Sequence, residues 1–333
     1  FRFIVNGKEV ETKEDKPLLR YLRDDLKCKS VKDGCSEGAC GTCTILIDGK
    51  AVRSCILTTK KAVGKNIVTV EGLSLQEKEA YVYAFGRAGS VQCGFCIPGM
   101  VMSAKALIDV NPNPTEEDIK KAIRSNICRC TGYKKIIEGI YLAAKVLRGE
   151  EKIQSDLESG EDFAVGQSAF RVDVREKVLG TGEYPDDVEM ENMVYGGAVR
   201  TEHPRAKILK INTEAAESLP GVLAVLKAED VPNNKVGHIQ QDWDVMIAEG
   251  DITRCIGDAL CLIVAETPSI LDAAKKLVKV EYEVLEPVRS IEEAKAENAP
   301  KIHPNGNLCQ QRHVTRGDAK AAIAAAKYVV TES

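Results

Sequence analysis

The sequence of 333 residues lacks the features that assign many proteins to a functional class at once. Its 46 basic and 50 acidic side chains leave a net charge of −4, so no excess of positive charge indicates binding to nucleic acid or to an anionic membrane surface. The longest uninterrupted apolar run, residues 259–265, is far shorter than the roughly 18 residues that would suggest a membrane-spanning helix. The amino-terminal residues alternate as in a strand and contain no hydrophobic signal-peptide region. We therefore expect a soluble, cytoplasmic protein.

Motifs for nucleotide binding and for histidine-based metal sites are also missing. No G-x-G-x-x-G motif follows an expected strand, and no Walker A motif occurs. The 4 histidines show no ligand spacing. We interpret the adjacent acids Asp186 and Asp187 as a solvated turn rather than as an acid–base pair.

Cysteine is the residue type that stands out, because the 12 cysteines are very unevenly placed. Nine of them lie between Cys28 and Cys130, and only Cys255, Cys261 and Cys309 follow. A disulfide scaffold would require a secreted and usually short chain, and nothing in the sequence indicates export. In a reducing compartment, clustered cysteines more often hold a metal. We therefore expect metal-binding groups in the first part of the chain.

The first 148 residues divide into a β-rich part and a helical part. Residues 1–75 begin with an alternating segment that is interrupted by the turn signal Asn6-Gly7. Leucines at helical spacing follow between Leu18 and Leu26, and strands are expected at 44–47 and 67–70. Residues 76–148 show helical periodicity, and four helices, which would make a bundle, are expected at 76–85, 98–110, 115–123 and 134–148.

The remainder of the chain changes character. Residues 149–166 are polar and charged, which predicts a linker. From 167 to 305 the pattern alternates, with a helix expected at 270–277 and strands expected at 172–174, 193–195, 208–211, 222–226, 260–264 and 278–284. Residues 306–333 contain an Ala-rich helix at 318–326 and a strand starting at 327. Because no fold unit is completed there, we expect the start of a further domain in a longer polypeptide.

The first cysteine group has the spacing Cys35-x4-Cys40-x2-Cys43-x11-Cys55. Three thiolates on one loop and a fourth from a following strand is the spacing of plant-type [2Fe–2S] sites. Such a loop must wrap closely around an anionic cluster and direct N–H groups at the sulfurs, which the glycines at 34, 38 and 41 permit. Structural zinc sites favour paired short knuckles instead. We interpret the group as an iron–sulfur site, with zinc or inert thiols as alternatives.

The second cysteine group consists of two pairs, Cys93-x2-Cys96 and Cys128-x-Cys130. We expect the first pair at the start of a helix and the second pair on a turn between two helices. A helix N-terminus stabilises anionic thiolates, which suits a cluster with net negative charge. Two facing pairs would supply four ligands, and their occurrence beside a plant-type site favours a second iron–sulfur cluster.

Three longer motifs enclose these cysteines: Gly34-Cys35-x2-Gly38-x-Cys40-Gly41-x-Cys43, Gln92-Cys93-Gly94-Phe95-Cys96-x-Pro98-Gly99 and Asn126-Ile127-Cys128-Arg129-Cys130-Thr131-Gly132-Tyr133. They resemble the molybdenum hydroxylases, the xanthine dehydrogenase and aldehyde oxidoreductase family. Residues 168–300 look like that family's α/β hammerhead domain, through the weaker motifs Gly182-Glu-Tyr-Pro-Asp-Asp, Pro220-Gly221-Val222-x-Ala224-Val225 and Gly257-Asp-Ala-Leu-Cys-Leu-Ile-Val-Ala-Glu. The resemblance covers nearly the whole chain.

The resemblance implies an α+β multidomain fold. A plant-type ferredoxin-like β-grasp domain would span 1–75, a four-helix-bundle [2Fe–2S] domain 76–148 and an α/β hammerhead domain 167–305. Residues 306–333 would begin a truncated molybdenum-binding domain.

It also implies an electron-transfer route. Substrate would be hydroxylated at a molybdopterin centre with water as the oxygen source, and two electrons would leave one at a time. The cluster nearer molybdenum would be held by Cys93, Cys96, Cys128 and Cys130. The cluster on the acceptor side would be held by Cys35, Cys40, Cys43 and Cys55. Gln92 would contact the pterin, and Cys130 would lie against it.

Two departures from the family limit this assignment. No flavin domain is inserted between the cluster domains and the hammerhead, so the acceptor would be a separate FAD subunit or another electron carrier. The family's catalytic glutamate has no counterpart in this sequence, so we assign no catalytic residue. The implied partners are molybdenum-binding domains or a molybdenum-binding subunit, in an oligomeric assembly without nucleic acid or membrane. Purines, aldehydes and other heterocycles all remain open as substrates.

A non-enzymatic electron-transfer protein with two clusters, or such a subunit, is the alternative. The hammerhead domain favours the hydroxylase, because a dedicated electron-transfer subunit would have no use for it. Of the cysteines outside the two groups, we expect Cys28, Cys255 and Cys261 to be buried as small hydrophobic residues.

Overall fold

The alternating amino terminus forms a hairpin in the computed structural model, which describes residues 1–154 and 170–332. The turn residues Asn6 and Gly7 have φ angles of 51° and 79°, the left-handed values that a tight hairpin turn requires. The hairpin is the edge of a five-stranded sheet in the order β2-β1-β5-β3-β4. Its strands are β1 (Arg2–Val5), β2 (Lys8–Glu11), β3 (Thr44–Ile47), β4 (Lys50–Arg53) and β5 (Asn66–Val68).

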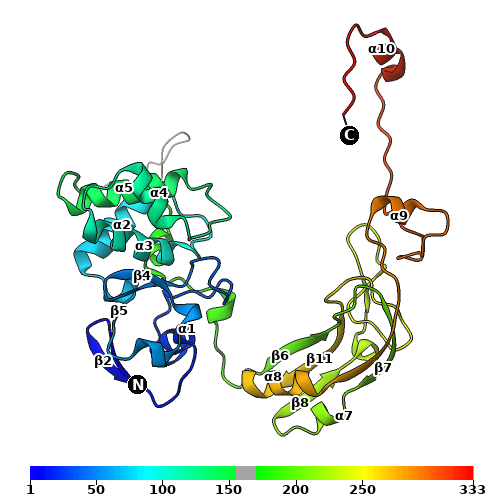
Figure 1. The fold of residues 1–333 in the computed structure, drawn as a ribbon, viewed down its shortest axis with the longest axis horizontal. Coiled ribbons are helices and arrows are strands. Elements are labelled where there is room, and N and C mark those ends of the chain that lie inside the picture. Colours follow the sequence, from blue (N-terminus) through cyan, green and yellow to red (C-terminus); the bar gives the residue numbers. More distant parts are fainter. Residues whose placement is uncertain (155–169, 333) are drawn as a thin grey trace. The chain divides into compact units, whose positions relative to one another are not determined.

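A short helical segment packs against this sheet (Figure 1). The expected helix forms as one α-helical turn, α1 (Leu18–Arg20), followed by a π-helical stretch, η1 (Tyr21–Asp25). Its leucines at 18, 19 and 22 are buried and share one core with the strand residues Phe3, Ile45 and Ile67. Burial of these apolar side chains between helix and sheet stabilises the β-grasp arrangement that the family resemblance implies.

The four helices expected between residues 76 and 148 are confirmed. They are α2 (Leu75–Arg87), α3 (Ile97–Val110), α4 (Glu116–Ile123) and α5 (Lys134–Leu147). The expected capping box is present at the start of α4, where the Thr115 side chain accepts from the backbone N–H of Asp118 and the Asp118 side chain accepts from that of Thr115. The helices pack around a core that includes Tyr81, Phe85 and Met100.

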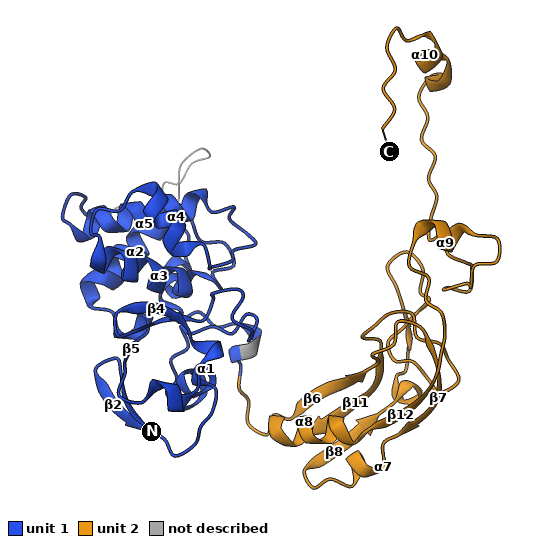
Figure 2. Ribbon diagram, in the orientation of Figure 1, with its two compact units in different colours: residues 1–188 blue, residues 189–333 orange. Residues whose placement is uncertain are grey.

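The sheet domain and the helical domain pack against each other. Leu46 of β3 and Val70 belong to the same buried cluster as the helices. A Cβ atom at Gly99 of α3 would lie 2.6 Å from the carbonyl oxygen of Thr42, so a larger residue would separate the helix from the cysteine loop. Both domains therefore belong to one compact unit, Phe1–Val188 (Figure 2).

This unit also contains residues 170–188, which the sequence assigned to the next domain. The strand predicted at 172–174 is wrong, because α6 (Val174–Leu179) forms instead and buries Val174 and Val178, four residues apart, against the helical core. The boundary between compact units, after Val188, thus differs from the domain start expected at 167. Of the predicted linker 149–166, residues 155–166 lie outside the described part of the chain.

In its described residues, the second unit, Glu189–Ser333, contains three small antiparallel sheets and several helices (Figure 1). One sheet has the order β6-β11-β8, and the other two pair β12 with β7 and β10 with β9. The elements are β6 (Tyr195–Arg200), β7 (Ala206–Asn212), α7 (Glu214–Glu217), β8 (Val222–Leu226), β9 (Lys235–Val236), β10 (Trp243–Asp244), β11 (Ala259–Ala265), α8 (Pro268–Leu277), β12 (Lys279–Val284), α9 (Ile291–Lys295) and α10 (Ala319–Ala325).

Most of the pattern-based predictions for this unit are confirmed. Alternation and helical periodicity placed the central strands and α8 within two residues of their observed bounds. The strand expected at 193–195 begins only at Tyr195, because a turn with Asn192 at a φ of 61° precedes it. The strand expected from 327 is wrong, since residues 327–332 are not paired in a sheet.

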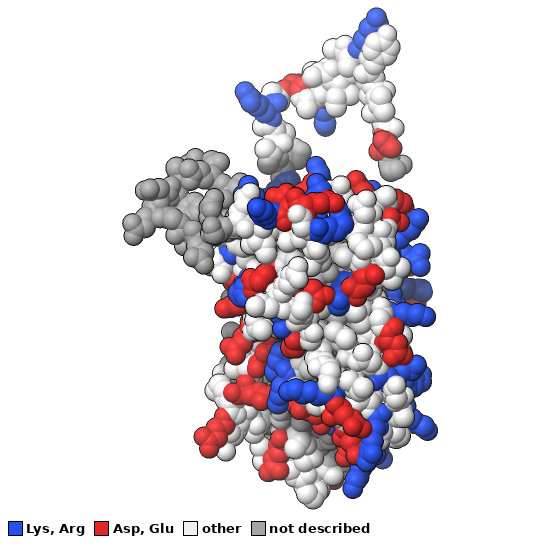
Figure 3. Space-filling model, turned by 90° about the vertical axis from the view of Figure 1, so that its left-hand side faces the viewer, with Lys and Arg blue, Asp and Glu red and all other residues white. Residues whose placement is uncertain are grey.

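The surface agrees with the balanced charge of the sequence. On the face displayed in Figure 3, acidic and basic side chains are interspersed, with no large area of one sign. In the described part of the chain, no helix has both the length and the apolar character needed to cross a membrane.

Candidate functional site

The first cysteine group lies at the end of the β-grasp sheet. Cys35, Cys40 and Cys43 sit on the loop between η1 and β3, and Cys55 sits in the 3-10 turn η2 (Ser54–Ile56) that follows β4. Backbone N–H groups of the loop are aimed at the sulfurs. The amide of Gly38 lies 3.2 Å from Sγ of Cys55, and the amides of residues 37 and 40 each lie 3.4 Å from Sγ of Cys35.

The glycines of this loop act as the sequence predicts. A Cβ at Gly34 would lie 2.9 Å from Sγ of Cys40, so a side chain there would press on the sulfur. Gly41 has a φ of 69°, and its Cβ would lie 2.1 Å from the carbonyl oxygen of Ser125 in the helical domain. The loop therefore depends on glycine both for its backbone conformation and for its contact with the second domain.

The thiols of the first group differ in their acidity. Hydrogen bonds from the backbone amides of Cys40 and Glu37 lower the pKa of Cys35 to about 7. Burial, followed by the neighbouring thiol of Cys43, raises the pKa of Cys55 to about 12. Adjacent thiols oppose each other's ionisation, so the group becomes fully anionic only when a cationic centre shares the sulfurs.

The second cysteine group lies at the end of the helical bundle. Cys93 precedes α3, Cys96 is its N-cap, and Cys128 and Cys130 lie on the connection between α4 and α5. The sulfurs of Cys93 and Cys130 are 3.7 Å apart. Burial raises the pKa of Cys96, and the charge of the neighbouring Cys128 adds to the shift. Two thiolates bound to one tetrahedral metal at about 2.3 Å lie about 3.8 Å apart, which the Cys93–Cys130 spacing fits.

The thiols of both groups meet as pairs. Cys35 contacts Cys40 and Cys43 contacts Cys55, while Cys93 contacts Cys130 and Cys96 contacts Cys128. Among the residues that the structure describes, no three His, Cys, Asp or Glu side chains converge to hold a metal ion. Two pairs of thiols suit a binuclear cluster, in which each iron takes two thiolates, better than a single zinc ion.

The two groups are joined by a residue whose role the sequence did not reveal. The buried side chain of Asn126 donates to the carbonyl of Gly41 at 2.9 Å and accepts from the hydroxyl of Ser103 at 2.8 Å. The next amide, that of Ile127, donates to the carbonyl of Cys40 at 2.8 Å. The sequence shows Asn126 only as part of a motif. Its contacts could not be predicted because its partners lie 85 and 23 residues away in the chain.

The expected pterin-contact residues lie on the surface of the helical domain. Gln92 and Cys130 are both exposed, and so is Cys93. This end of the second group is thus open to a partner surface, whereas Cys96 is buried.

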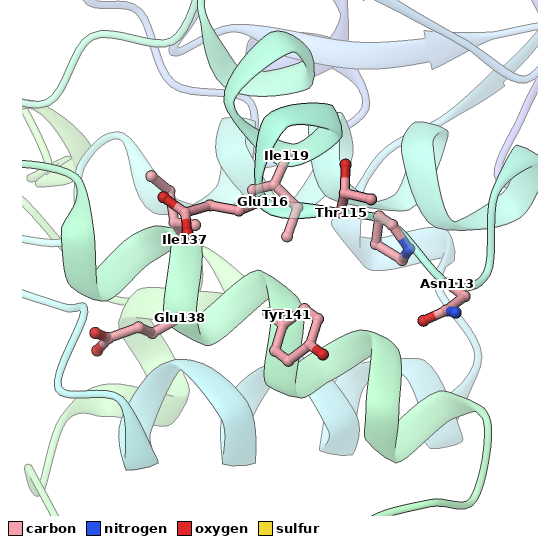
Figure 4. Close-up of a pocket in the computed structure, with 8 residues that line it drawn as sticks. Asn113, Thr115, Glu116, Ile119, Ile137, Glu138 and Tyr141 are labelled. Atoms are coloured by element: carbon pink, nitrogen blue, oxygen red, sulfur yellow. The ribbon is translucent and has the colours of Figure 1, made fainter.

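Other candidate positions lie away from the two groups. A groove between α4 and α5 contains none of the eight cysteines, and its lining is Asn113, Pro114, Thr115, Glu116, Ile119, Ile137, Glu138 and Tyr141 (Figure 4). Cys28 and Cys261 are buried as expected, and burial raises the pKa of each to about 11. Cys255 is exposed, contrary to the prediction, because its thiol turns to the carboxylate of Asp258 at 3.2 Å.

Three family models match the chain in consecutive segments. Residues 3–67 match the 2Fe-2S iron-sulfur cluster binding domain, and residues 69–141 match the [2Fe-2S] binding domain. Residues 179–286 match the a/b hammerhead domain of aldehyde oxidase and xanthine dehydrogenase. Each of the two cysteine groups therefore lies within a 2Fe-2S domain.

Individual proteins match the same parts. The chain is 33% identical to the aldehyde oxidoreductase of Megalodesulfovibrio gigas, covering 98% of this chain but 38% of that protein. It is 44% identical to the nicotinate dehydrogenase small FeS subunit of Eubacterium barkeri, covering 42% of this chain and 92% of the subunit. The solved structure of aldehyde oxidoreductase from Desulfovibrio gigas matches with a TM-score of 0.85 at 31% identity, covering 98% of this chain and 39% of the other. The chain thus belongs to the aldehyde oxidoreductase and xanthine dehydrogenase family of molybdenum hydroxylases, of which it carries the two 2Fe-2S domains and the hammerhead domain.

Proposed function

We propose that this chain is the electron-transfer portion of a molybdenum-dependent hydroxylase. The observation that supports the proposal most strongly is the pair of four-cysteine groups in one compact unit, joined by hydrogen bonds between their loops. Cys35, Cys40, Cys43 and Cys55 would hold one [2Fe–2S] cluster, and Cys93, Cys96, Cys128 and Cys130 would hold the other. Each cluster, when bound, accepts a single electron and passes it on.

The chain's own residues prepare both groups for this role. Amides of the first loop point at Sγ of Cys35 and of Cys55, and such hydrogen bonds stabilise the negative charge that reduction adds. Between the groups, the amide of Ile127, next to Cys128, donates to the carbonyl of Cys40. Asn126 keeps these two loops in register through its contact with Gly41. The distance that an electron must cross is thereby fixed by the packing of the two domains.

The second group would face the molybdopterin centre. Gln92 and Cys130 are exposed beside it, which leaves them accessible to a pterin held by molybdenum-binding domains or by a separate subunit. Hydroxylation of a substrate by water releases two electrons and two protons, and the electrons would pass singly through the second and then the first group. The acceptor would be a separate FAD subunit or another carrier. We assign the protein to a reducing compartment, the cytoplasm, because none of its cysteines forms a disulfide. We assign it to an oligomeric complex because its relatives include a small FeS subunit.

Metal and sulfide analysis of the purified full-length chain tests this proposal. Two [2Fe–2S] clusters predict about four iron and four acid-labile sulfide per chain. Zinc in place of iron, or about two iron per chain, would contradict it.

The alternative is a two-cluster electron-transfer protein without hydroxylase activity. It is favoured by the match of about 42% of the chain to 92% of a small FeS subunit. The hammerhead match at residues 179–286 favours the hydroxylase instead. Reduction of the clusters by a heterocyclic or aldehyde substrate, in the complex with its molybdenum-binding part, would distinguish the two.

A further inference from the structure

Residues 170–188, here called the return segment, pack on the cysteine domains rather than on the second unit. Its helix α6 buries Val174 and Val178 in the helical core. The ring of Phe170 lies against Gly86 of α2, where a Cβ would come within 2.0 Å of the ring. Two hydrogen bonds join Arg175 to the carboxylate of Glu79. The segment is thus anchored to the helical domain over its first ten residues.

The end of the return segment is anchored to the sheet domain. The carboxylate of Asp187 is 6% exposed and lies 2.5 Å from the guanidinium of Arg23 and 3.2 Å from the ammonium of Lys32. Burial acts to raise the pKa of Asp187, but the two cations hold it below its usual value. The Lys32 side chain is only 1% exposed, so this carboxylate is its buried counter-charge. The interpretation of Asp187 as part of a solvated turn is therefore wrong.

Between these anchors the return segment contacts one side of the Cys93–Cys96 loop. The hydroxyl of Tyr184 donates to the carbonyl of Cys93 at 2.8 Å, and its ring meets that of Phe95 edge-on with centroids 5.1 Å apart. The stem of Lys177 lies against Gly94, where a Cβ would come within 2.7 Å of it. The cluster loop is therefore held by side chains from about 90 residues further along the chain.

Two lysines lie where the return segment meets this loop. The ammonium groups of Lys177 and Lys32 lie 4.0 Å and 4.8 Å from the centroid of the Tyr184 ring. Asp173, a carboxylate in Coulombic range of Lys177, is paired with Arg171. The Lys177 stem lies against Gly94, so its ammonium places a positive charge near this loop. A cation near a cluster stabilises the reduced form, which carries one more negative charge than the oxidised form.

We propose that the return segment is a positioning element for the second cysteine group, in which Tyr184 fixes the Cys93–Cys96 loop and Lys177 raises the reduction potential of the cluster held there. The inference rests on the proposed function, since it requires a cluster at Cys93, Cys96, Cys128 and Cys130. The side-chain contacts of Lys177 in the described part of the chain are with Gly94, Gly182 and Tyr184, so we expect its charge to act mainly on the second group. The segment therefore sets the difference in potential between the two electron carriers.

A redox titration of the full chain, followed by EPR, tests this inference. The variant Lys177→Met keeps the length of the stem and removes its charge, and we expect the midpoint potential of one EPR signal to become more negative while the other stays unchanged. Lys177→Arg retains the charge and should retain the potential. Arg175→Gln, on the same helix but paired with Glu79, is the matched control and should leave both potentials unchanged.

The structural part of the inference has its own readout. Tyr184→Phe keeps the ring and removes the hydrogen bond to Cys93, so the same signal should change in line shape, with the other signal unaltered. Unchanged potentials in Lys177→Met, or equal shifts of both signals, would overturn the inference while leaving the proposed function intact. Absence of two cluster signals in the unmodified chain would overturn both.

Discussion

The sulfurs of the first cysteine group receive their hydrogen bonds from amides of the group's own loop, whereas the loop of the second group is held by side chains far away in the sequence. In the first group, amides and glycines between residues 34 and 41 supply the contacts to the sulfurs. In the second group, Tyr184 and Lys177 contact the Cys93–Cys96 loop. The other two cysteines, Cys128 and Cys130, follow α4. A motif can therefore encode the sulfur contacts of the first site, but the surroundings of the second depend on tertiary packing.

We expect the largest difference between the two cysteine groups when one of them loses a cluster ligand. We expect Cys130→Ser to lower the iron content from about four to about two per chain, because a cluster that loses a thiolate ligand is not retained. One EPR signal should disappear and the other should remain, measured on the reduced full-length chain. Loss of both signals would show that the two sites are not independent.

The ion pairs of Asp187 with Arg23 and Lys32 allow a test of how much the return segment stabilises the first unit. Asp187→Asn should reduce the free energy of unfolding by about 3 kcal/mol or more, because Arg23 and Lys32 would be left as buried cations without a carboxylate. Denaturant unfolding followed by circular dichroism measures the loss. Glu176→Gln, an exposed residue on the same segment, is the control and should change stability little.

The contact between the two loops can be broken at a glycine. Gly41→Ala should cost at least about 2 kcal/mol, since the methyl group adds a clash with the carbonyl of Ser125 to the strain of a positive φ. Gly49→Ala is a matched control, because Gly49 has a φ of 78° and nothing within 4 Å of its Cβ position. The control should lose only about 1 kcal/mol. Equal losses in the two variants would mean that the loops do not touch as described.

In the unmodified chain, acid should weaken the contacts of Asp187 with Arg23 and Lys32. The folded-state pKa of this carboxyl lies below its ordinary value of 3.8, so its stabilising effect is fully present above that pH and is lost as the pH falls through the lower folded value. Asp187→Asn lacks this contribution. The difference in unfolding free energy between the two chains should therefore narrow below about pH 4. A constant difference across that range would contradict the assignment.

The smallest expected effect concerns a helix end away from both groups. Thr115→Ala removes the N-cap of α4 and should reduce stability by about 1 kcal/mol, as measured by the urea midpoint. Both EPR signals should keep their potentials, because the groove at Thr115 contains no cluster ligand. A shift in either potential would show that the helical bundle transmits strain to the cysteine loops.

Much of the fold could be predicted because its signals are local. The Asn6-Gly7 turn, the capping box at Thr115 and the periodicity of α8 are each contained in a few adjacent residues. The return segment could not be predicted in this way. The sequence around Val174 and Val178 is compatible with a helix or a strand. The helix forms because it buries both side chains against the helical bundle.

The same distinction applies to the site. The eight cysteines could be recognised from their spacing in the sequence. Three of the first group lie on one short loop, and the second group consists of two closely spaced pairs. The roles of Asn126, Tyr184 and Asp187 depend on partners 85 to 164 residues away, and no spacing rule reports such contacts. Asp187 was misread because an acid beside another acid in a proline-containing turn is usually solvated, whereas here Arg23 and Lys32 neutralise it in a buried position.

EPR quantitation of the fully reduced, full-length chain tests the central claim most directly. Two [2Fe–2S] clusters held in different surroundings predict two distinguishable signals, each integrating to about one spin per chain. They should appear at different potentials during a stepwise reduction, with Lys177→Met moving only one of them. A single signal of about one spin, or a chain that contains zinc and remains silent on reduction, would contradict the account.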